Sequence, residues 1–322
     1  MDTKVIINSE ILNLAYVPDN LPFREKELAL ITRNVANGVN TLVYGPPGCG
    51  KTALAKTVGM QSSGASRRVV YIDCSLYQTV NSVLRETLTD RLVFSRSNYD
   101  LLKKLNEKTR VNKATVCLDH FDRTREPDIV GKLIGIGLSV IIVATNDDAL
   151  DELDLRTRAF VSSMIYLTDY SLDQAFTLLK ARADLALAKW SVKESTLRRI
   201  VEKTRGNIAL SLNVLRACAL YAESEGKKTI EELELAEILR QHDCPVNMGN
   251  DERTLLNILE ERKSLPSNAL FQLYRSIAKY PKQDRSFRKY MQRLRERGLV
   301  KAFGDKTGRF YEIVPGERSV GG

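Results

Sequence analysis

Short, almost continuous apolar runs alternate with longer amphipathic segments in the first half of the chain. Five such runs, rich in β-branched residues, stand at 39–45, 68–74, 114–121, 139–146 and 162–169. Runs of this kind are typical of strands buried on both faces, and the segments between them are long enough for crossover helices. The pattern therefore predicts an α/β domain with a parallel sheet, which we assign to residues 1–169.

The strand pattern stops at Ser171, and apolar residues then recur about every 3.6 positions as far as residue 241. Gly206 and Gly226 interrupt this helical pattern. Residues 170–248 are therefore predicted to form a small helical domain. It ends in a linker at 243–250, which contains Pro245 and Gly249.

The last part of the chain, residues 249–322, has a third pattern. Amphipathic helices are predicted at 250–263, 267–280 and 284–298, and two short strands follow around a glycine-rich turn at 304–308. Three helices followed by a β-hairpin are typical of a winged helix, a variant of the helix-turn-helix.

Composition narrows the class of protein without identifying it. Of the 322 residues, 43% are hydrophobic and 28% are charged, and no run of 18 apolar residues or charged-then-apolar leader occurs. The five cysteines are widely spaced and form no CxxC or Cys/His pair. We therefore expect a cytoplasmic protein with no membrane span and no structural zinc.

The net charge of +9 is concentrated near the C-terminal end. Residues 251–322 hold 16 Lys and Arg against 9 Asp and Glu, whereas the preceding 250 residues hold 33 against 31. A surplus confined to one predicted domain indicates an acidic partner such as nucleic acid.

The segment GPPGCGKT at 45–52 matches a phosphate-binding loop, and it stands between a predicted strand and a predicted helix. Its glycines allow backbone N–H groups to close around phosphate oxygens, and the following helix adds its positive N-terminal end. Lys51 would meet the β- and γ-phosphates, and the hydroxyl of Thr52 would meet Mg²⁺. The residues expected to hold the nucleotide here are Gly45, Pro46, Pro47, Gly48, Cys49, Gly50, Lys51, Thr52 and Ala53.

Two other predicted strands end in polar residues that suit the same site. Asp119 ends an apolar strand and is expected to hold Mg²⁺ through water, together with Thr52. Asn146 ends another strand, and its amide is placed to orient water near the γ-phosphate. His120 follows Asp119, where such strands often carry a glutamate that activates water.

Taken together, these segments resemble AAA+ ATPases, and among them the archaeal replication initiators of the origin-recognition and cell-division-control type, including divergent paralogues. The resemblance covers nearly the whole chain. It rests on YVPDNLPFREKEL (16–28), GPPGCGKT, LDHFD, VIIVATND, LDLRTRAFVSSMIYLTDY (153–170), the helical domain and the terminal winged helix.

This resemblance implies an ATP or ADP site with Mg²⁺ and a helical domain that acts as its lid. It places Val17, Pro18 and Arg24 against the adenine, and it places an arginine finger for a neighbouring subunit's nucleotide at Arg156, with Arg158 as the alternative. The catalytic set is then Asp119, His120, Asn146 and Arg156.

Two positions depart from the family pattern. His120 stands in place of the glutamate, and in the lid segment GNIA Ala209 stands in place of an arginine that senses the γ-phosphate. A neutral imidazole does not match a carboxylate in charge or reach. We therefore hypothesise that ATP is bound, that it is hydrolysed very slowly, and that it holds the sheet domain and the lid in one orientation.

The third helix of the winged helix carries the most concentrated positive charge. Residues 281–310 contain 10 Lys and Arg against 3 acids. Phe287, Tyr290, Met291 and Leu294 recur at helical spacing and are expected to face the core, which turns the cations outward. The residues expected to contact duplex DNA are Arg285, Arg288, Lys289, Gln292 and Arg295 on the helix, with Lys306 and Arg309 in the wing.

Together with this resemblance, the sequence implies a nucleoid-associated, ATP-dependent protein that binds double-stranded DNA, with a replicative helicase or other initiator copies as further expected partners. Two other interpretations stay open. One is a P-loop signalling or defence ATPase whose winged helix binds protein. The other is an oligomeric loader-type ATPase that needs Arg156 in trans.

Overall fold

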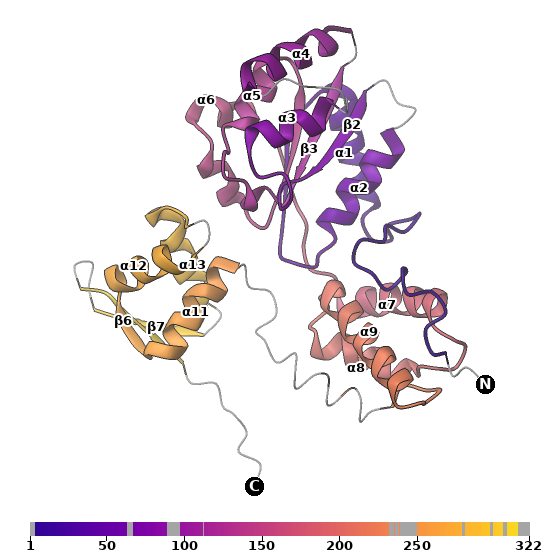
Figure 1. Cartoon of the computed structure of the whole chain (residues 1–322). Helices are drawn as coiled ribbons and strands as arrows, with labels where there is room; N and C mark the ends of the chain where they lie inside the picture. The colour runs from indigo at the N-terminus through magenta and orange to yellow at the C-terminus, as the bar shows by residue number, and fades with distance from the viewer. Residues whose placement is uncertain are drawn as a thin grey trace. The chain divides into compact units, whose positions relative to one another are not determined.

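The computed structural model describes residues 4–62, 67–88, 97–111, 113–231, 235, 238, 250–278, 281–296, 299–304 and 308–314 (Figure 1). The chain divides into two compact units, Met1–Asn247 and Met248–Gly322. Lys306, residues 243–249 of the predicted linker and most of the predicted helix at 229–241 lie outside the described residues. No described helix is both long enough and apolar enough to cross a membrane.

Within the described part of the first unit, five parallel strands form one sheet. They are β1 (Thr41–Tyr44), β2 (Arg68–Asp73), β3 (Ala114–Asp119), β4 (Ser139–Ala144) and β5 (Ser163–Tyr166), in the order β2-β3-β4-β1-β5. Every strand lies inside one of the five predicted runs. Asp73 is paired with Asp119, so the carboxyl ends of β2 and β3 lie level with each other.

Helices cover both faces of this sheet, which explains why its strands are apolar at consecutive positions. Along β4, Ile142 packs with the helices α3 (Val80–Leu88), α4 (Asn98–Val111) and α5 (Ile129–Gly135). The neighbouring Val143 packs instead with α1 (Glu25–Asn37) and α2 (Lys51–Gln61). Short helices η2 (Phe121–Arg123), η3 (Asp147–Glu152) and α6 (Leu155–Ala159) follow β3 and β4. The predicted α/β class is confirmed.

The helical lid contains α7 (Leu172–Ala186), α8 (Glu194–Lys203) and α9 (Ile208–Ser224). A capping box between Ser171 and Gln174 begins α7 where the strand pattern ends. The lid has its own apolar core, and Val5, Ile11 and Leu12 belong to it. The N-terminal segment therefore packs with the lid, although the sequence analysis assigned it to the sheet domain.

Two contacts hold the N-terminal segment on the lid. The Glu223 carboxylate of α9 accepts hydrogen bonds from the backbone N–H groups of Val5 and Ile6. Arg182 of α7 stacks on the Tyr16 ring and donates to the carbonyls of Ile11 and Tyr16. These pairs join residues more than 150 positions apart in sequence, so no local pattern could have indicated them.

The second unit has the element order of a winged helix. It consists of α11 (Asn250–Arg262), β6 (Ser264–Pro266), α12 (Ser267–Ile277), α13 (Asp284–Glu296), β7 (Val300–Phe303) and β8 (Phe310–Ile313). The strand β6 was not predicted; it pairs with β8 in a sheet of order β6-β8-β7. Phe287, Tyr290, Met291 and Leu294 of α13 are buried in the core, as the apolar stripe predicted.

Candidate nucleotide site and nucleic-acid surface

The phosphate loop joins the end of β1 to the start of α2. Gly48 and Gly50 have φ angles of 86° and 96°, in the left-handed region that favours glycine. The Lys51 ammonium lies inside the loop, where it donates to the carbonyl oxygens of Gly45 at 2.7 Å and Pro46 at 2.8 Å. The loop backbone therefore surrounds a positive charge at the N-terminus of a helix.

These residues fit a polyphosphate. The backbone N–H groups of Gly48 and Gly50 donate to no acceptor in the part of the chain that the structure describes. Together with Lys51 and the first turn of α2, they supply the donors and positive charge that bound phosphate oxygens require. Thr52 and Ala53 follow in that turn, and Pro46 and Pro47 are half-buried in the loop. Burial raises the pKa of the Cys49 thiol in this loop, so the thiol stays neutral.

Asp119 lies at the end of β3 with 1% of its surface exposed. The Tyr71 hydroxyl donates to its Oδ2 at 2.7 Å, and the backbone N–H of His120 donates to its Oδ1 at 2.8 Å. Burial and the neighbouring Asp119 raise the pKa of Tyr71, so the phenol remains a donor at neutral pH. The carboxylate is thus fixed in orientation and suits a magnesium ion held through water and phosphates.

Among the described residues, no group of three or more His, Cys, Asp and Glu is arranged to hold a metal ion. A magnesium ion commonly has few protein ligands, because it keeps several waters and binds substrate phosphates. Asp119 and Thr52 are compatible with this kind of binding, and their role stays a prediction.

His120 has a left-handed backbone conformation with φ of 53°, and its side chain is 46% exposed. Its Nδ1 lies 3.1 Å from Oδ1 of Asp73 and 3.7 Å from Oδ2 of Asp119. A ring nitrogen that faces carboxylate oxygens carries the hydrogen, which leaves Nε2 as the acceptor in the neutral ring.

The contact with Asp73 turns the imidazole toward β2. In the sheet, β2 flanks β3 on the side opposite to β4 and β1, whereas the phosphate loop follows β1. Burial alone would raise the pKa of Asp73, but hydrogen bonds from Ser75 and the nearby His120 outweigh it and lower that pKa. The ring is therefore held on the far side of β3 from the loop by a carboxylate that is ionised at neutral pH.

Asn146, predicted to orient water, caps the short helix η3. Its side-chain oxygen accepts a hydrogen bond from the backbone N–H of Asp148 at 3.1 Å. The neighbouring Thr145 is fixed through its N–H and hydroxyl by the Asp122 carboxylate, each at 2.8 Å. In the described part of the chain, the amide nitrogen of Asn146 has no hydrogen-bond partner, and the catalytic role of Asn146 stays a prediction.

The residues predicted to contact adenine differ in their surroundings. Arg24 is buried, stacks on the Tyr170 ring, and donates to the carbonyls of Cys49 at 3.0 Å and Thr168 at 2.5 Å. It therefore joins the phosphate loop to the end of β5, a role that the sequence analysis missed. Val17 and Pro18 are half-buried just before it, and their contact with adenine stays a prediction.

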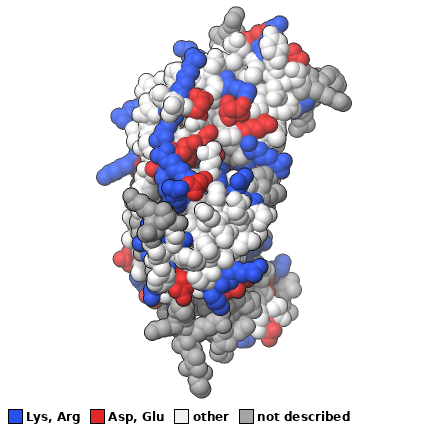
Figure 2. All heavy atoms as spheres, turned by 90° about the vertical axis from the view of Figure 1, so that its left-hand side faces the viewer, with Lys and Arg blue, Asp and Glu red and all other residues white. Residues whose placement is uncertain are grey.

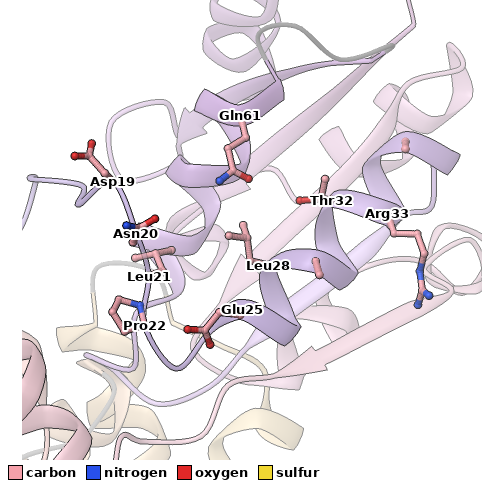
Figure 3. Close-up of a pocket in the computed structure, with 11 residues that line it drawn as sticks. Asp19, Asn20, Leu21, Pro22, Glu25, Leu28, Thr32, Arg33 and Gln61 are labelled. Atoms are coloured by element: carbon pink, nitrogen blue, oxygen red, sulfur yellow. The ribbon is translucent and has the colours of Figure 1, made fainter.

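A separate groove of about 690 Å³ runs along α1 (Figure 3). Its lining includes Asn20 from the preceding segment, Leu28 and Thr32 of α1, and Gln61 at the end of α2. Gln61 lies at the opposite end of α2 from Lys51, and Val17, Pro18 and Arg24 do not line the groove. This groove is therefore distinct from the predicted adenine contacts.

The two arginines considered for the finger are distinguished by their partners. Arg158 pairs with Asp151 at 2.7 Å. Arg156 is exposed on α6 and has no side-chain partner among the described residues. The geometry therefore leaves Arg156, and not Arg158, available for a partner outside the chain.

The cations predicted to meet DNA lie on the outer side of α13. Arg285, Arg288, Gln292 and Arg295 are exposed, Lys289 is half-buried, and Arg309 is exposed at the start of β8. Arg288 forms an ion pair with Asp284 one turn earlier. Figure 2 shows Lys and Arg side chains next to Asp and Glu side chains on parts of the face that it presents.

The comparison with known families agrees with this geometry. Residues 41–165, from the start of β1 into the last strand β5, match the model of the ATPase family associated with various cellular activities (AAA). These residues form an AAA family domain.

Similarity extends well beyond the AAA domain. The chain is 29% identical to an ORC1-type DNA replication protein of Picrophilus torridus, over 86% of this chain and 72% of that protein. The Aeropyrum pernix ORC2 protein in ADPNP–ADP complexes has a TM-score of 0.68 at 19% identity and covers 97% of this chain and 95% of that one. The Aeropyrum pernix ORC1 protein in complex with DNA has a TM-score of 0.68 at 18% identity, with 97% and 94% covered. The chain is thus similar in sequence to an ORC1-type DNA replication protein, and it shares the fold of these two solved structures along almost its whole length.

The sequence analysis missed three residues that hold the predicted site residues in place. Tyr71 and Asp73 fix Asp119 and His120, and Asn207 of the lid donates to the Pro47 carbonyl in the phosphate loop at 2.9 Å. The alignment of strand ends at β2 and β3 could have indicated Asp73. Nothing in the local sequence indicates the contact of Asn207, which lies 160 residues from Pro47.

Proposed function

We propose that this chain is an ATP-binding protein of the replication-initiator type that binds double-stranded DNA and uses ATP as a conformational switch. The observation that carries the proposal is an intact phosphate cradle in a homologue of ORC1-type DNA replication proteins. The cradle is contacted directly by the lid, so a nucleotide there can influence the relative position of the two.

ATP would be held by the loop N–H groups, Lys51 and the first turn of α2. Magnesium bound through Thr52, Asp119 and waters would neutralise phosphate charge. Asp119 is already oriented by Tyr71, which favours ordered binding of the ion. Val17 and Pro18 would meet the adenine, and Arg24 would keep the loop in place beneath it.

Hydrolysis would be slow for two reasons that the geometry supports. The residue after Asp119 is an imidazole that bonds to Asp73, on the side of β3 away from the loop. In the lid, Ala209 offers no charge to the γ-phosphate. Neither feature removes a donor from the phosphate loop, so binding would persist while turnover falls.

The winged helix would hold the DNA, with α13 in the major groove and the wing beside it. Each phosphate that a Lys or Arg contacts releases counterions, so affinity would fall steeply with salt. The outward cations of α13 and the exposed Arg309 support this assignment. Recruitment of a helicase or of other copies of the chain, and a place on the nucleoid, belong to the same proposal.

A second candidate, an oligomeric loader-type ATPase, is favoured by one observation. Arg156 is exposed without a partner among the described residues, as an arginine acting on a neighbour's nucleotide would be. In that case DNA would stimulate hydrolysis, and Arg156→Ala would abolish the stimulation.

The test is duplex binding by the full chain over a salt series, with Mg-ATP, with ADP and without nucleotide, alongside a nuclease footprint. We expect steep salt dependence and a footprint that changes with ATP in the natural chain but not in Lys51→Ala. A flat salt dependence, or no binding at low salt, would contradict the proposal and favour a winged helix that binds protein.

A further inference from the structure

The three glycines of the phosphate loop lie against the lid and the segment leading to it. A Cβ added to Gly45 would lie 2.2 Å from the Leu167 carbonyl oxygen, and one added to Gly48 would lie 2.1 Å from Oδ1 of Asn207. At Gly50 the Tyr170 hydroxyl would be 2.9 Å away. Contacts this short do not occur for real Cβ atoms, so the glycines serve close packing of the lid as well as the left-handed backbone.

Among these contacts in the described chain, only that of Asn207, the residue that caps the N-terminus of α9, comes from the lid. Its Oδ1 accepts a hydrogen bond from the Leu210 N–H at 3.0 Å and so caps α9. Its Nδ2 donates to the Pro47 carbonyl at 2.9 Å. Asn207 is buried, with 6% of its surface exposed. One planar amide therefore joins the first turn of α9 to the peptide before Gly48.

A displacement of this peptide would be transmitted into the body of the lid. With 17 residues, α9 is about 25 Å long. Its buried side chains, including Leu212, Leu215 and Cys218, lie in the lid core. Because the cap fixes one end of the amide, the other end can follow the loop only if α9 moves with it.

The lid residues at this contact, Gly206 to Ala209, carry no charged side chain. They cannot attract a phosphate by an ion pair, but they can respond to the loop that holds one. The N–H of Gly48 points to no described acceptor, so phosphate binding would act on the same peptide segment that Asn207 contacts.

We propose that Asn207 is a positioning residue that couples the conformation of the phosphate loop to the position of the lid. The inference rests on the proposed function, because it supplies the link through which ATP would act as a switch. Phosphates fix the Pro47–Gly48 backbone from the N–H side, and Asn207 binds the same backbone from the lid side. ATP binding and lid closure then favour each other.

The test compares Asn207→Ser with the natural chain. A serine keeps an oxygen that caps α9 but lacks the amide that reaches Pro47. Asn213→Ser is the matched control, since Asn213 is exposed on the same helix and makes no described side-chain contact. Melting temperature without nucleotide, Mg-ATP affinity by calorimetry, and amide exchange over residues 45–53 and 206–214 are measured for each.

We expect Asn207→Ser to melt within about 2 °C of the natural chain and to bind Mg-ATP about fivefold more weakly, the effect of losing one hydrogen bond. ATP should still slow amide exchange in the loop but no longer in the first turn of α9. Asn213→Ser should behave like the natural chain in every measurement.

Natural ATP affinity together with natural protection of α9 in Asn207→Ser would overturn the inference. So would a lowered melting temperature with an unchanged response to ATP, because the residue would then serve only as a helix cap. If the natural chain itself does not bind Mg-ATP, the proposed function is wrong. That result is seen without the variant, so it is distinguished from a failure of the inference about Asn207.

Discussion

The nucleotide site has two ends that differ in how much of their chemistry is present. At the end of β1, the loop supplies N–H groups that have no acceptor among the described residues, together with Lys51 and a helix N-terminus. At the end of β3, Asp119 is held by Tyr71, but the next residue is an imidazole bonded to Asp73. Under the proposed function, capture and cleavage of a nucleotide would thus depend on different strands, and one could weaken while the other is kept.

Replacing Lys51 should have the largest effect on nucleotide binding, because it removes the positive charge from the phosphate loop at the end of β1. We expect Lys51→Ala to weaken Mg-ATP binding about 100-fold, as loss of charge-assisted bonds to phosphate would. Calorimetry checks it, with Lys26→Ala, an exposed lysine of α1, as the control. Binding at natural strength would show that the loop does not hold the phosphates.

Restoring a carboxylate at the altered end should raise turnover. The double variant Asp73→Asn with His120→Glu places glutamate after Asp119 and removes the negative charge 3.1 Å from the present ring. We expect about a tenfold to hundredfold rise in steady-state phosphate release, with ATP affinity unchanged. Asp73→Asn alone is the control. If the double variant turns over no faster, the imidazole is not what limits hydrolysis.

Removing the Tyr71 hydroxyl should affect the metal more than the nucleotide. We expect Tyr71→Phe to weaken ATP binding about fivefold in magnesium and not at all in EDTA, because the hydroxyl orients the Asp119 carboxylate. The control is Tyr166→Phe, which removes a hydroxyl from β5, elsewhere in the sheet. An equal loss with and without magnesium would mean that Tyr71 only supports the fold.

In the winged helix, single cations should contribute modestly and uniformly. We expect Arg295→Ala to weaken duplex binding about threefold to tenfold at low salt and to reduce the salt slope by about 1. Arg253→Ala, an exposed arginine on α11, is the control. Equal affinities and slopes for Arg295→Ala and the natural chain would exclude this residue from the interface.

The smallest expected effect is the pH dependence of the free energy of unfolding that Asp73, the partner of His120, contributes. The pKa of Asp73 is lowered in the folded chain, so the folded state favours its ionised form. Its stabilising contribution is present above the unfolded pKa of about 3.9 and is lost as pH falls through the lower, folded pKa. The free energies of unfolding of the natural chain and Asp73→Asn, measured in urea, should differ by a constant amount above about pH 5 and converge as pH falls below about 4. A difference that stays constant over the whole pH range would contradict this assignment.

The parts that sequence predicted well are those with local patterns. Apolar runs located the five strands of the parallel sheet, and the glycine spacing of 45–52 located the phosphate loop, because each pattern depends on residues close together in the chain. The apolar stripe of α13 likewise fixed which side of that helix is buried.

Long-range contacts were not predictable in this way. The strand β6 has only three residues and is stabilised by β8, nearly 50 positions later. The N-terminal segment lies on the lid through Arg182 and Glu223, and Arg24 meets Thr168 at the end of β5. None of these pairs leaves a periodic signal, since each joins segments that lie far apart in the sequence.

The central claim, that ATP is held but barely cleaved, is tested most directly by single- and multiple-turnover ATPase assays of the full chain with duplex DNA. We predict that labelled ATP remains bound to the protein and that steady-state release stays far below about 1 s⁻¹. Sustained turnover near that rate, abolished by Lys51→Ala, would contradict the account.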